Sequence, residues 1–138
     1  MDSEERIAAF LAGKAYAVAG ASRQREKYGN KVLRVYMQQG LTVYPLNPSP
    51  GPVEGLESYA APAALPAGVH GLSVVTPPAV SELVVEEAAA SGIGHIWMQP
   101  GAESPEAVRR GEELGLNVIA GGPCILVVLG YSETAPLG

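Results

Sequence analysis

Small residues followed by basic ones gather in one short segment of the sequence, directly after an apolar run. The run Ala15 to Ala19 leads into Gly20, Ala21 and Ser22. Five of the nine Lys and Arg residues then fall within twelve positions: Arg23, Arg25, Lys27, Lys31 and Arg34. Small residues let a ligand approach the main chain closely, and clustered cations attract phosphate groups. Because the chain is acidic overall, with a net charge of −5, this local excess of cations predicts a polyphosphate site.

The same segment lacks the marks of the common nucleotide-binding loops. A dinucleotide fingerprint would place G-x-G-x-x-G in this loop and an Asp or Glu at the end of the next strand. Here the loop from Gly20 to Gly29 does not have that spacing, and the next strand ends in Asn47 and Pro48. A Walker loop and the acidic pair of a receiver domain are also absent from the sequence. These features argue against NAD and favour another phosphate-bearing ligand.

Groups suited to catalysis are scarce where a ligand would bind. His70 and His95 are expected at the starts of their strands, ~16 Å from the carboxyl ends for strands of ~5 residues. No carboxylate pair follows a strand, so general acid–base catalysis lacks its usual groups. Ser22 has no predictable base, and Cys124, the single cysteine, cannot form an internal disulfide or a cysteine-based zinc site. We therefore expect no catalytic residues, no metal and a reducing, cytoplasmic location.

The apolar patterns that must position these residues alternate between strand and helix periodicity. Strand-like runs occupy 15–19, 41–46, 69–75, 95–98 and 116–120, and helical spacing occupies 4–12, 30–39, 77–92 and 105–115. Thr76 is expected to cap the third helix, with Pro77 in its first turn. Pro45 has no N–H and is expected at a position where the sheet needs no hydrogen-bond donor. Strands alternating with helices predict a doubly wound, mostly parallel α/β sheet with helices on both faces.

Length and composition fit one domain over residues 1–138. Hydrophobic residues make up 47% of the chain, enough to bury a core without disulfides. No apolar stretch approaches the ~18 residues of a membrane span, and the acidic balance opposes binding to nucleic acid. The apolar run from Ile125 to Leu129 is either a final packed segment or a contact with a second copy or another protein. We expect neither nucleic acid nor a membrane as a partner.

Four short strings at successive strand ends resemble one protein family. They are Val18 to Ser22 (VAGAS), Val43 to Pro48 (VYPLNP), Val75 to Pro78 (VTPP) and Ile96 to Gly101 (IWMQPG). Over roughly Glu4 to Cys124, the chain resembles the stand-alone bacterial CoA-binding domain proteins. That family is in turn similar to the N-terminal domain of the succinyl-CoA synthetase alpha subunit. Each string alone is weak, but four in order at four strand ends are fairly specific.

The resemblance implies a fold and a ligand. The fold is a Rossmann-like, five-stranded parallel sheet of order 3-2-1-4-5, and the ligand is coenzyme A or an acyl-CoA bound at the carboxyl edge of the sheet. The CoA diphosphate would lie at Gly20, Ala21, Ser22 and Arg23. The expected role is that of a non-catalytic binding or sensor module.

The rest of the ligand is expected on either side of the diphosphate. The resemblance implies adenine and ribose near Asn47 and Pro48, with Val75, Thr76 and Pro77 lining the opposite wall.

The 3′-phosphate would bind Arg25, Lys27 or Lys31, and the sequence does not choose among these three. Tyr28, at the end of the same loop, could stack on the ligand, donate a hydrogen bond to it, or pack internally.

Two further functions stay open at the level of the sequence. One is an acyl-CoA hydrolase or transferase that uses Cys124 or Ser22 as its nucleophile, which would release product from an acyl-CoA. The other is a nicotinamide-nucleotide redox sensor, which would prefer NADH to CoA despite the missing carboxylate after the second strand.

Overall fold

A computed structural model of the chain describes residues 1–137, in which strands and helices alternate as expected. The elements are α1 (Ser3–Leu11), β1 (Ala15–Ala19), α2 (Tyr28–Gln38), β2 (Thr42–Leu46), the 3₁₀ helix η1 (Pro62–Ala64), β3 (Gly71–Val74), α3 (Pro78–Ala90), β4 (His95–Met98), α4 (Pro105–Glu113), β5 (Asn117–Ile119) and α5 (Ile125–Val128). No helix in this described part is both long and apolar enough to cross a membrane.

Side-chain caps explain where two of the helices begin. The Asp2 side chain accepts a hydrogen bond from the main-chain N–H of Glu5 at 2.8 Å, and Ser104 Oγ accepts one from Ala107 at 3.0 Å. Both satisfy N–H groups that the first helical turn leaves without partners.

Thr76 does not cap α3, and on this point the prediction is wrong. Pro77 is the capping residue and has an extended conformation (ψ 147°), while Pro78 opens the helix. A residue that precedes a proline is driven out of the helical region, so Pro78 prevents Pro77 from being helical. The Thr76 hydroxyl instead lies 2.8 Å from Ser81 Oγ.

The strand order is 2-1-3-4-5, and all four strand pairs are parallel. The α/β fold is therefore confirmed, but the order 3-2-1-4-5 is wrong, because β3 lies between β1 and β4 instead of beside β2. Pro45 shows why β2 belongs at the edge. Its carbonyl faces outward, where it accepts a hydrogen bond from Tyr59, so its missing N–H also faces outward and β1 loses no bond.

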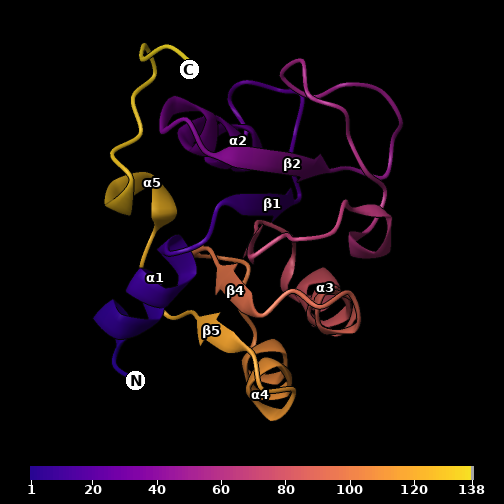
Figure 1. The fold of residues 1–138 in the computed structure, drawn as a ribbon, viewed down its shortest axis with the longest axis vertical. Coiled ribbons are helices and arrows are strands. Elements are labelled where there is room, and N and C mark those ends of the chain that lie inside the picture. The colour runs from indigo at the N-terminus through magenta and orange to yellow at the C-terminus, as the bar shows by residue number, and fades with distance from the viewer. Residues whose placement is uncertain (138) are drawn as a thin grey trace.

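Helices cover both faces of the sheet. Alternate strand residues pack on α1, α2 and α5 on one face and on α3 and α4 on the other, and Figure 1 shows these two layers on opposite sides of the strands. Trp97 of β4 is fully buried among Phe10 and its neighbours on the first face, and its Nε1 donates a hydrogen bond to the Pro123 carbonyl at 3.0 Å.

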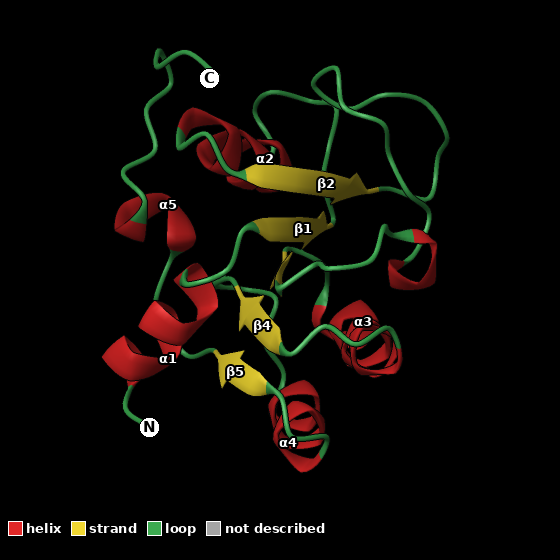
Figure 2. Cartoon of the chain, in the orientation of Figure 1, coloured by secondary structure: helices red, strands yellow, loops and turns green. Residues whose placement is uncertain are grey.

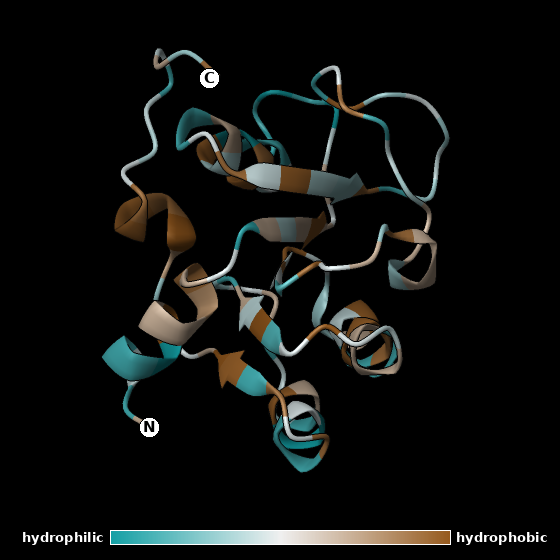
Figure 3. Cartoon of the chain, viewed as in Figure 1, coloured by the Kyte–Doolittle hydropathy of each residue, from teal (hydrophilic) through white to brown (hydrophobic). Residues whose placement is uncertain are grey.

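The apolar run after Cys124 forms α5 and is only partly packed. Ile125 is fully buried, whereas Val127 and Val128 are 80% and 42% exposed. Figure 3 shows α5 as an apolar helix on the outside of the sheet, from which the C-terminal segment continues alongside α2. Gln38 and Gln39 at the end of α2 hold this segment by donating hydrogen bonds to the carbonyls of Ser132 and Leu129.

Candidate functional site

The strand order creates a crevice between the carboxyl ends of β1 and β3. The chain leaves β1 toward β2 on one side and returns to β3 on the other, and loops diverge at such a reversal. Figure 2 shows the loops that leave the ends of β1 and β2. A cavity of about 410 Å³ lies at this reversal, and its lining consists of Gly20, Ser22, Gln24, Lys27, Tyr28, Gly29 and Val75.

Two glycines let the main chain pack closely beside this cavity. Gly20 has a φ of 88°, and a Cβ there would overlap the carbonyl of Val75 at the end of β3. A Cβ on Gly29, in the first turn of α2, would overlap the Gly20 carbonyl. The start of α2 is thus held directly against the end of β1, and both glycines line the cavity.

Three of the five clustered cations already have partners. Arg34 is buried and forms an ion pair with Glu54, with Nη1 and Oε1 2.9 Å apart. Lys31 Nζ lies 2.8 Å from Glu133 Oε1, and Arg23 donates to the carbonyls of Ser49, Gly51 and Pro52. Sequence position alone could not show these pairs, because the partners are 20 or more residues away.

Arg25 and Lys27 are the two cations of the cluster whose side chains have no hydrogen-bond or ion-pair partner within residues 1–137. Both are exposed, and Lys27 lines the cavity. They are therefore available to an anion that enters from solvent.

Asn47 and Pro48 lie beside the β1 loop, because β2 pairs with β1. Asn47 Nδ2 donates to the Ala21 carbonyl at 2.9 Å, and its Oδ1 accepts from the Ser49 N–H at 2.8 Å. Figure 1 shows that the loops after β1 and β2 leave the same end of the sheet. Arg23 joins these loops by donating a hydrogen bond to the Ser49 carbonyl at 2.9 Å. These bonds hold the loop after β2 against the loop after β1.

Asn30 also joins the same two loops through hydrogen bonds. Its Nδ2 donates to the Ser22 carbonyl and to Glu54 Oε2, both at 2.9 Å. Since Glu54 also pairs with Arg34, α2 is linked through buried polar groups to both loops that border the cavity.

Val75 and Thr76 are half-buried at the end of β3 and adjoin Gly20, and Pro77 is exposed. Ser81 Oγ donates to the Ala102 carbonyl at 2.7 Å, which leaves the Thr76 hydroxyl to donate to Ser81. Of these three predicted wall residues, Val75 lines the cavity and Thr76 lies next to Gly20, whereas Pro77 is not part of the lining.

The end of β4 contributes a polar residue, Gln99, to which the sequence interpretation gave no role. Gln99, directly after β4, is fully buried, and its Oε1 accepts hydrogen bonds from Tyr28 Oη at 3.3 Å and from the Ile125 N–H at 2.9 Å. Tyr28 Oη also lies 2.8 Å from Cys124 Sγ. A polar residue that immediately follows an apolar strand was the signal that could have indicated Gln99.

Burial raises the pKa of Tyr28 well above its usual value, and the hydrogen bond with Cys124 and the negative charge of Glu103 raise it further. Tyr28 therefore stays protonated at neutral pH. With a single proton to give, it can donate to Gln99 while the Cys124 thiol donates to Tyr28.

Glu103 is a carboxylate near the carboxyl edge that the sequence interpretation did not include. Its Oε1 accepts a hydrogen bond from the Gly101 N–H at 3.0 Å. No group of three or more His, Cys, Asp and Glu residues within 1–137 is arranged to hold a metal ion.

The two histidines lie at the opposite edge of the sheet, as predicted. His95 opens β4, His70 precedes β3, and their rings stack with centroids 4.1 Å apart. His70 Nε2 lies 2.9 Å from the Ala9 carbonyl of α1. These positions separate both imidazoles from the crevice by the length of the strands.

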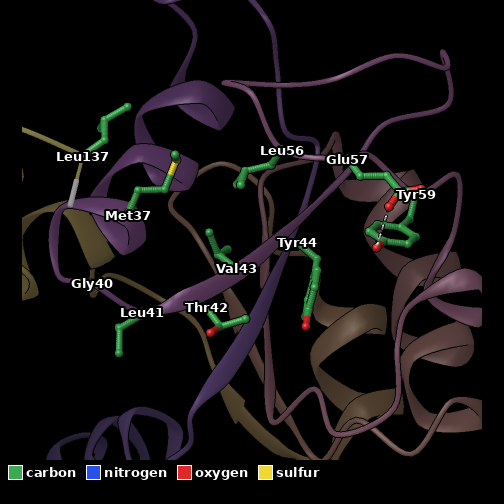
Figure 4. Close-up of a pocket in the computed structure, with 10 residues that line it drawn as sticks. All are labelled: Met37, Gly40, Leu41, Thr42, Val43, Tyr44, Leu56, Glu57, Tyr59 and Leu137. Carbon is green, nitrogen blue, oxygen red and sulfur yellow. Dashed lines mark hydrogen bonds between the residues drawn. The ribbon is translucent and has the colours of Figure 1, made fainter.

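A separate cavity of about 470 Å³ follows the outer edge of β2, away from the strand ends (Figure 4). Leu41, Val43 and Tyr44 contribute to it from β2 and its start, together with Leu56 and Leu137. None of the residues predicted to bind a ligand lines this cavity.

Comparisons with known proteins give a matching family and several similar structures. Residues 14–130 match the family described as CoA binding domain. A conserved hypothetical protein of Pyrococcus furiosus is similar in structure, with 38% identity, coverage of 83% of this chain and 98% of the other, and a TM-score of 0.79. A Thermus thermophilus protein has 30% identity, coverage of 94% and 97%, and a TM-score of 0.82.

Part of a longer enzyme is also similar. The dinucleotide-forming acetyl-coenzyme A synthetase 1 of Ca. Korarchaeum cryptofilum matches 76% of this chain at 28% identity with a TM-score of 0.67, and the match covers 25% of that enzyme. The fold thus occurs both in chains of similar length and within a larger protein.

Proposed function

This chain belongs to the CoA-binding domain family, and from that premise we propose that it binds coenzyme A or an acyl-CoA at the carboxyl edge of its sheet as a non-catalytic binding or sensor module. The observation that carries the proposal is the cavity at the reversal between β1 and β3, which Gly20, Ser22, Lys27 and Tyr28 line. In this proposal the whole chain acts as one CoA-binding domain.

The diphosphate lies against Gly20, Ala21 and Ser22 in this proposal, where the close packing of Gly29 on Gly20 supports a narrow main-chain cradle. Arg23 adds positive potential, but its main task is to hold the 49–52 turn through three carbonyls. The adenosine half then extends over Asn47 and Pro48.

The 3′-phosphate binds Arg25 or Lys27 in this proposal, because these two cations have no competing partner in the described chain. Lys31 is the less favourable of the three candidates, since a phosphate would first have to displace Glu133. Charge-assisted hydrogen bonds to phosphate are the stronger kind, so these contacts should separate CoA from dephospho-CoA.

A binding role is favoured over catalysis by the surroundings of the two candidate nucleophiles. Ser22 Oγ accepts a hydrogen bond from the Gln24 N–H at 3.1 Å, and no base is bonded to it. Cys124 contacts the protonated Tyr28 hydroxyl, which does not remove a proton from a thiol.

A melting experiment with CoA, dephospho-CoA, NADH and ATP tests the proposal. A ligand at ~100 times its dissociation constant stabilises by ~2.7 kcal/mol, which raises the melting temperature of a domain of this size by roughly 10 °C. We expect the largest shift with CoA, a smaller one with dephospho-CoA, and little with NADH.

If NADH raised the melting temperature more than CoA, the proposal would be wrong and the nicotinamide-nucleotide sensor would be favoured. Release of free CoA thiol from acetyl-CoA, lost in Cys124→Ala or Ser22→Ala, would overturn its non-catalytic part.

A further inference from the structure

The ends of β4 and β5 hold a group of polar side chains that the phosphate and adenosine contacts do not use. Gln99 follows β4, Cys124 comes after β5, and Tyr28 reaches both from the start of α2. Tyr28 also lines the cavity at Gly20, so this group adjoins the proposed site for the diphosphate.

Gln99 carries a buried donor without a partner. The residue is fully buried, and its Nε2 has no hydrogen-bond partner in the described chain. The orientation of the amide is fixed, because Oε1 accepts from the Ile125 N–H at 2.9 Å and a flipped amide would place two donors against each other. A buried donor left unpaired is costly, so Nε2 needs an acceptor from elsewhere.

The strand order gives the direction in which a CoA molecule would reach this group. With adenosine at the β2 end and diphosphate at the β1 end, the pantetheine arm continues past β3 toward β4 and β5. From β1 to β5 there are three strand spacings, which together measure ~14 Å. The arm is about as long as four extended residues, which is also ~14 Å.

We propose, on the basis of the CoA site above, that Gln99, Cys124 and Tyr28 form the subsite for the sulfur end of the ligand, in which Gln99 Nε2 donates a hydrogen bond to a thioester carbonyl. The protein accordingly prefers an acyl-CoA to CoA, because a free thiol offers no carbonyl oxygen to this donor. The 3.3 Å separation between Tyr28 Oη and Gln99 Oε1 is long for a hydroxyl donor, so Tyr28 gives up a weak bond when it turns aside to admit the acyl group.

Calorimetric titration of the full chain with CoA, acetyl-CoA and S-ethyl-CoA tests this subsite. S-ethyl-CoA has nearly the size of acetyl-CoA but lacks the carbonyl oxygen. We expect acetyl-CoA to bind about tenfold more tightly than the other two, as one hydrogen bond to a buried donor allows. Equal affinities for acetyl-CoA and S-ethyl-CoA would overturn this inference and leave the CoA site intact, whereas no binding of any of the three would overturn the CoA site itself.

Substitution of Gln99 provides the second arm. Gln99→Met keeps the length of the side chain without the donor and should bring the ratio between acetyl-CoA and S-ethyl-CoA close to one. Gln39→Met, on an exposed residue at the far end of α2, is the matched control and should keep the tenfold ratio. An unchanged ratio in Gln99→Met contradicts the inference, and if that variant does not fold, the comparison of ligands in the unmodified chain still decides.

Discussion

Lys27 and Lys14 carry the same charge at opposite edges of the sheet, which makes them a matched pair for testing the 3′-phosphate. Both side chains are exposed. Lys27→Ala should weaken CoA binding roughly five- to tenfold and leave dephospho-CoA binding nearly unchanged, since only CoA carries that phosphate. Lys14→Ala removes the same charge and should change neither titration. If Lys27→Ala weakens both ligands equally, Lys27 does not contact the 3′-phosphate, and Arg25→Ala becomes the variant to compare.

Gly20 and Gly40 are both left-handed, but only Gly20 is crowded. Their φ values are 88° and 71°, and a Cβ on Gly40 would meet no atom within 4 Å. Gly40→Ala should therefore cost only the backbone strain, about 1 kcal/mol. Gly20→Ala adds overlap with the Val75 carbonyl and should cost about 3 kcal/mol in total. Urea unfolding measures both, and equal losses would show that the end of β3 yields to the added methyl group.

At the scale of residues, a sequence shows where charges occur but not which of them are already neutralised. The predicted cation cluster includes Arg34, whose guanidinium is buried against Glu54, and Lys31, which pairs with Glu133. Gly20 and Ser22 of the predicted loop, by contrast, do line a cavity. They are only two positions apart in the chain, so no distant partner is needed to bring them together. Gln99 escaped prediction since its role depends on Tyr28 and Ile125, which only the fold brings to it.

The link between α2 and the loop after β2 depends on one buried carboxylate. Glu54 and Arg34 are 15% and 8% exposed, so Glu54→Gln leaves a guanidinium without its counter-charge and should lower the free energy of unfolding by about 3 kcal/mol. Glu106→Gln removes an exposed partner of Arg109 on α4 and serves as the control, with no measurable change expected. Equal effects of the two substitutions would mean that the Glu54 pair contributes no more than a surface pair.

The stacked histidines at the edge where β3 and β4 begin should make the free energy of unfolding depend on pH. Burial and the neighbouring His70 lower the pKa of His95, and its Nδ1 accepts a hydrogen bond from Asn117 Nδ2 at 3.0 Å, which favours the neutral ring. The unfolded chain, with a histidine pKa of about 6.5, then binds a proton more readily than the folded one. The free energy of unfolding should therefore be highest above this pKa and should fall as the pH drops through and below it.

Urea midpoints from pH 8 to pH 5 measure this effect, and His95→Gln should flatten part of the decline. A curve of unchanged steepness in the variant would assign the decline to other groups.

At the scale of elements, periodicity and turn residues predicted each strand and each of the four longer helices to within a few residues at their ends. The strand order was not predictable in the same way, because the apolar pattern of β3 would be the same whether β3 paired with β2 or with β1. Pro45 nevertheless carried the missing information, since a central β2 would have lost a hydrogen bond there. The cap of α3 was misplaced by one residue for a comparable local reason, the effect of Pro78 on Pro77.

For the molecule as a whole, the sheet separates two edges that should respond independently. The strands β3 and β4 have four residues each and place the stacked histidines ~13 Å from the crevice, beyond the range at which substitutions usually couple. A chain with both His95→Gln and Lys27→Ala should therefore show the pH profile of the first variant and the CoA affinity of the second. A pH profile or an affinity that differs from that of the single variants would reveal a coupling through the strands.

The position of Trp97 makes its intrinsic fluorescence a probe of one end of the sheet. It is the single tryptophan of the chain, it lies fully shielded within the core, and its indole is hydrogen-bonded to the carbonyl just before Cys124. Its fluorescence emission therefore reports on one short stretch of backbone, the one next to Gln99 and Cys124. Any rearrangement that loosens this carbonyl from the indole will shift the emission without an attached dye, so that occupancy of this end of the sheet can be followed in real time.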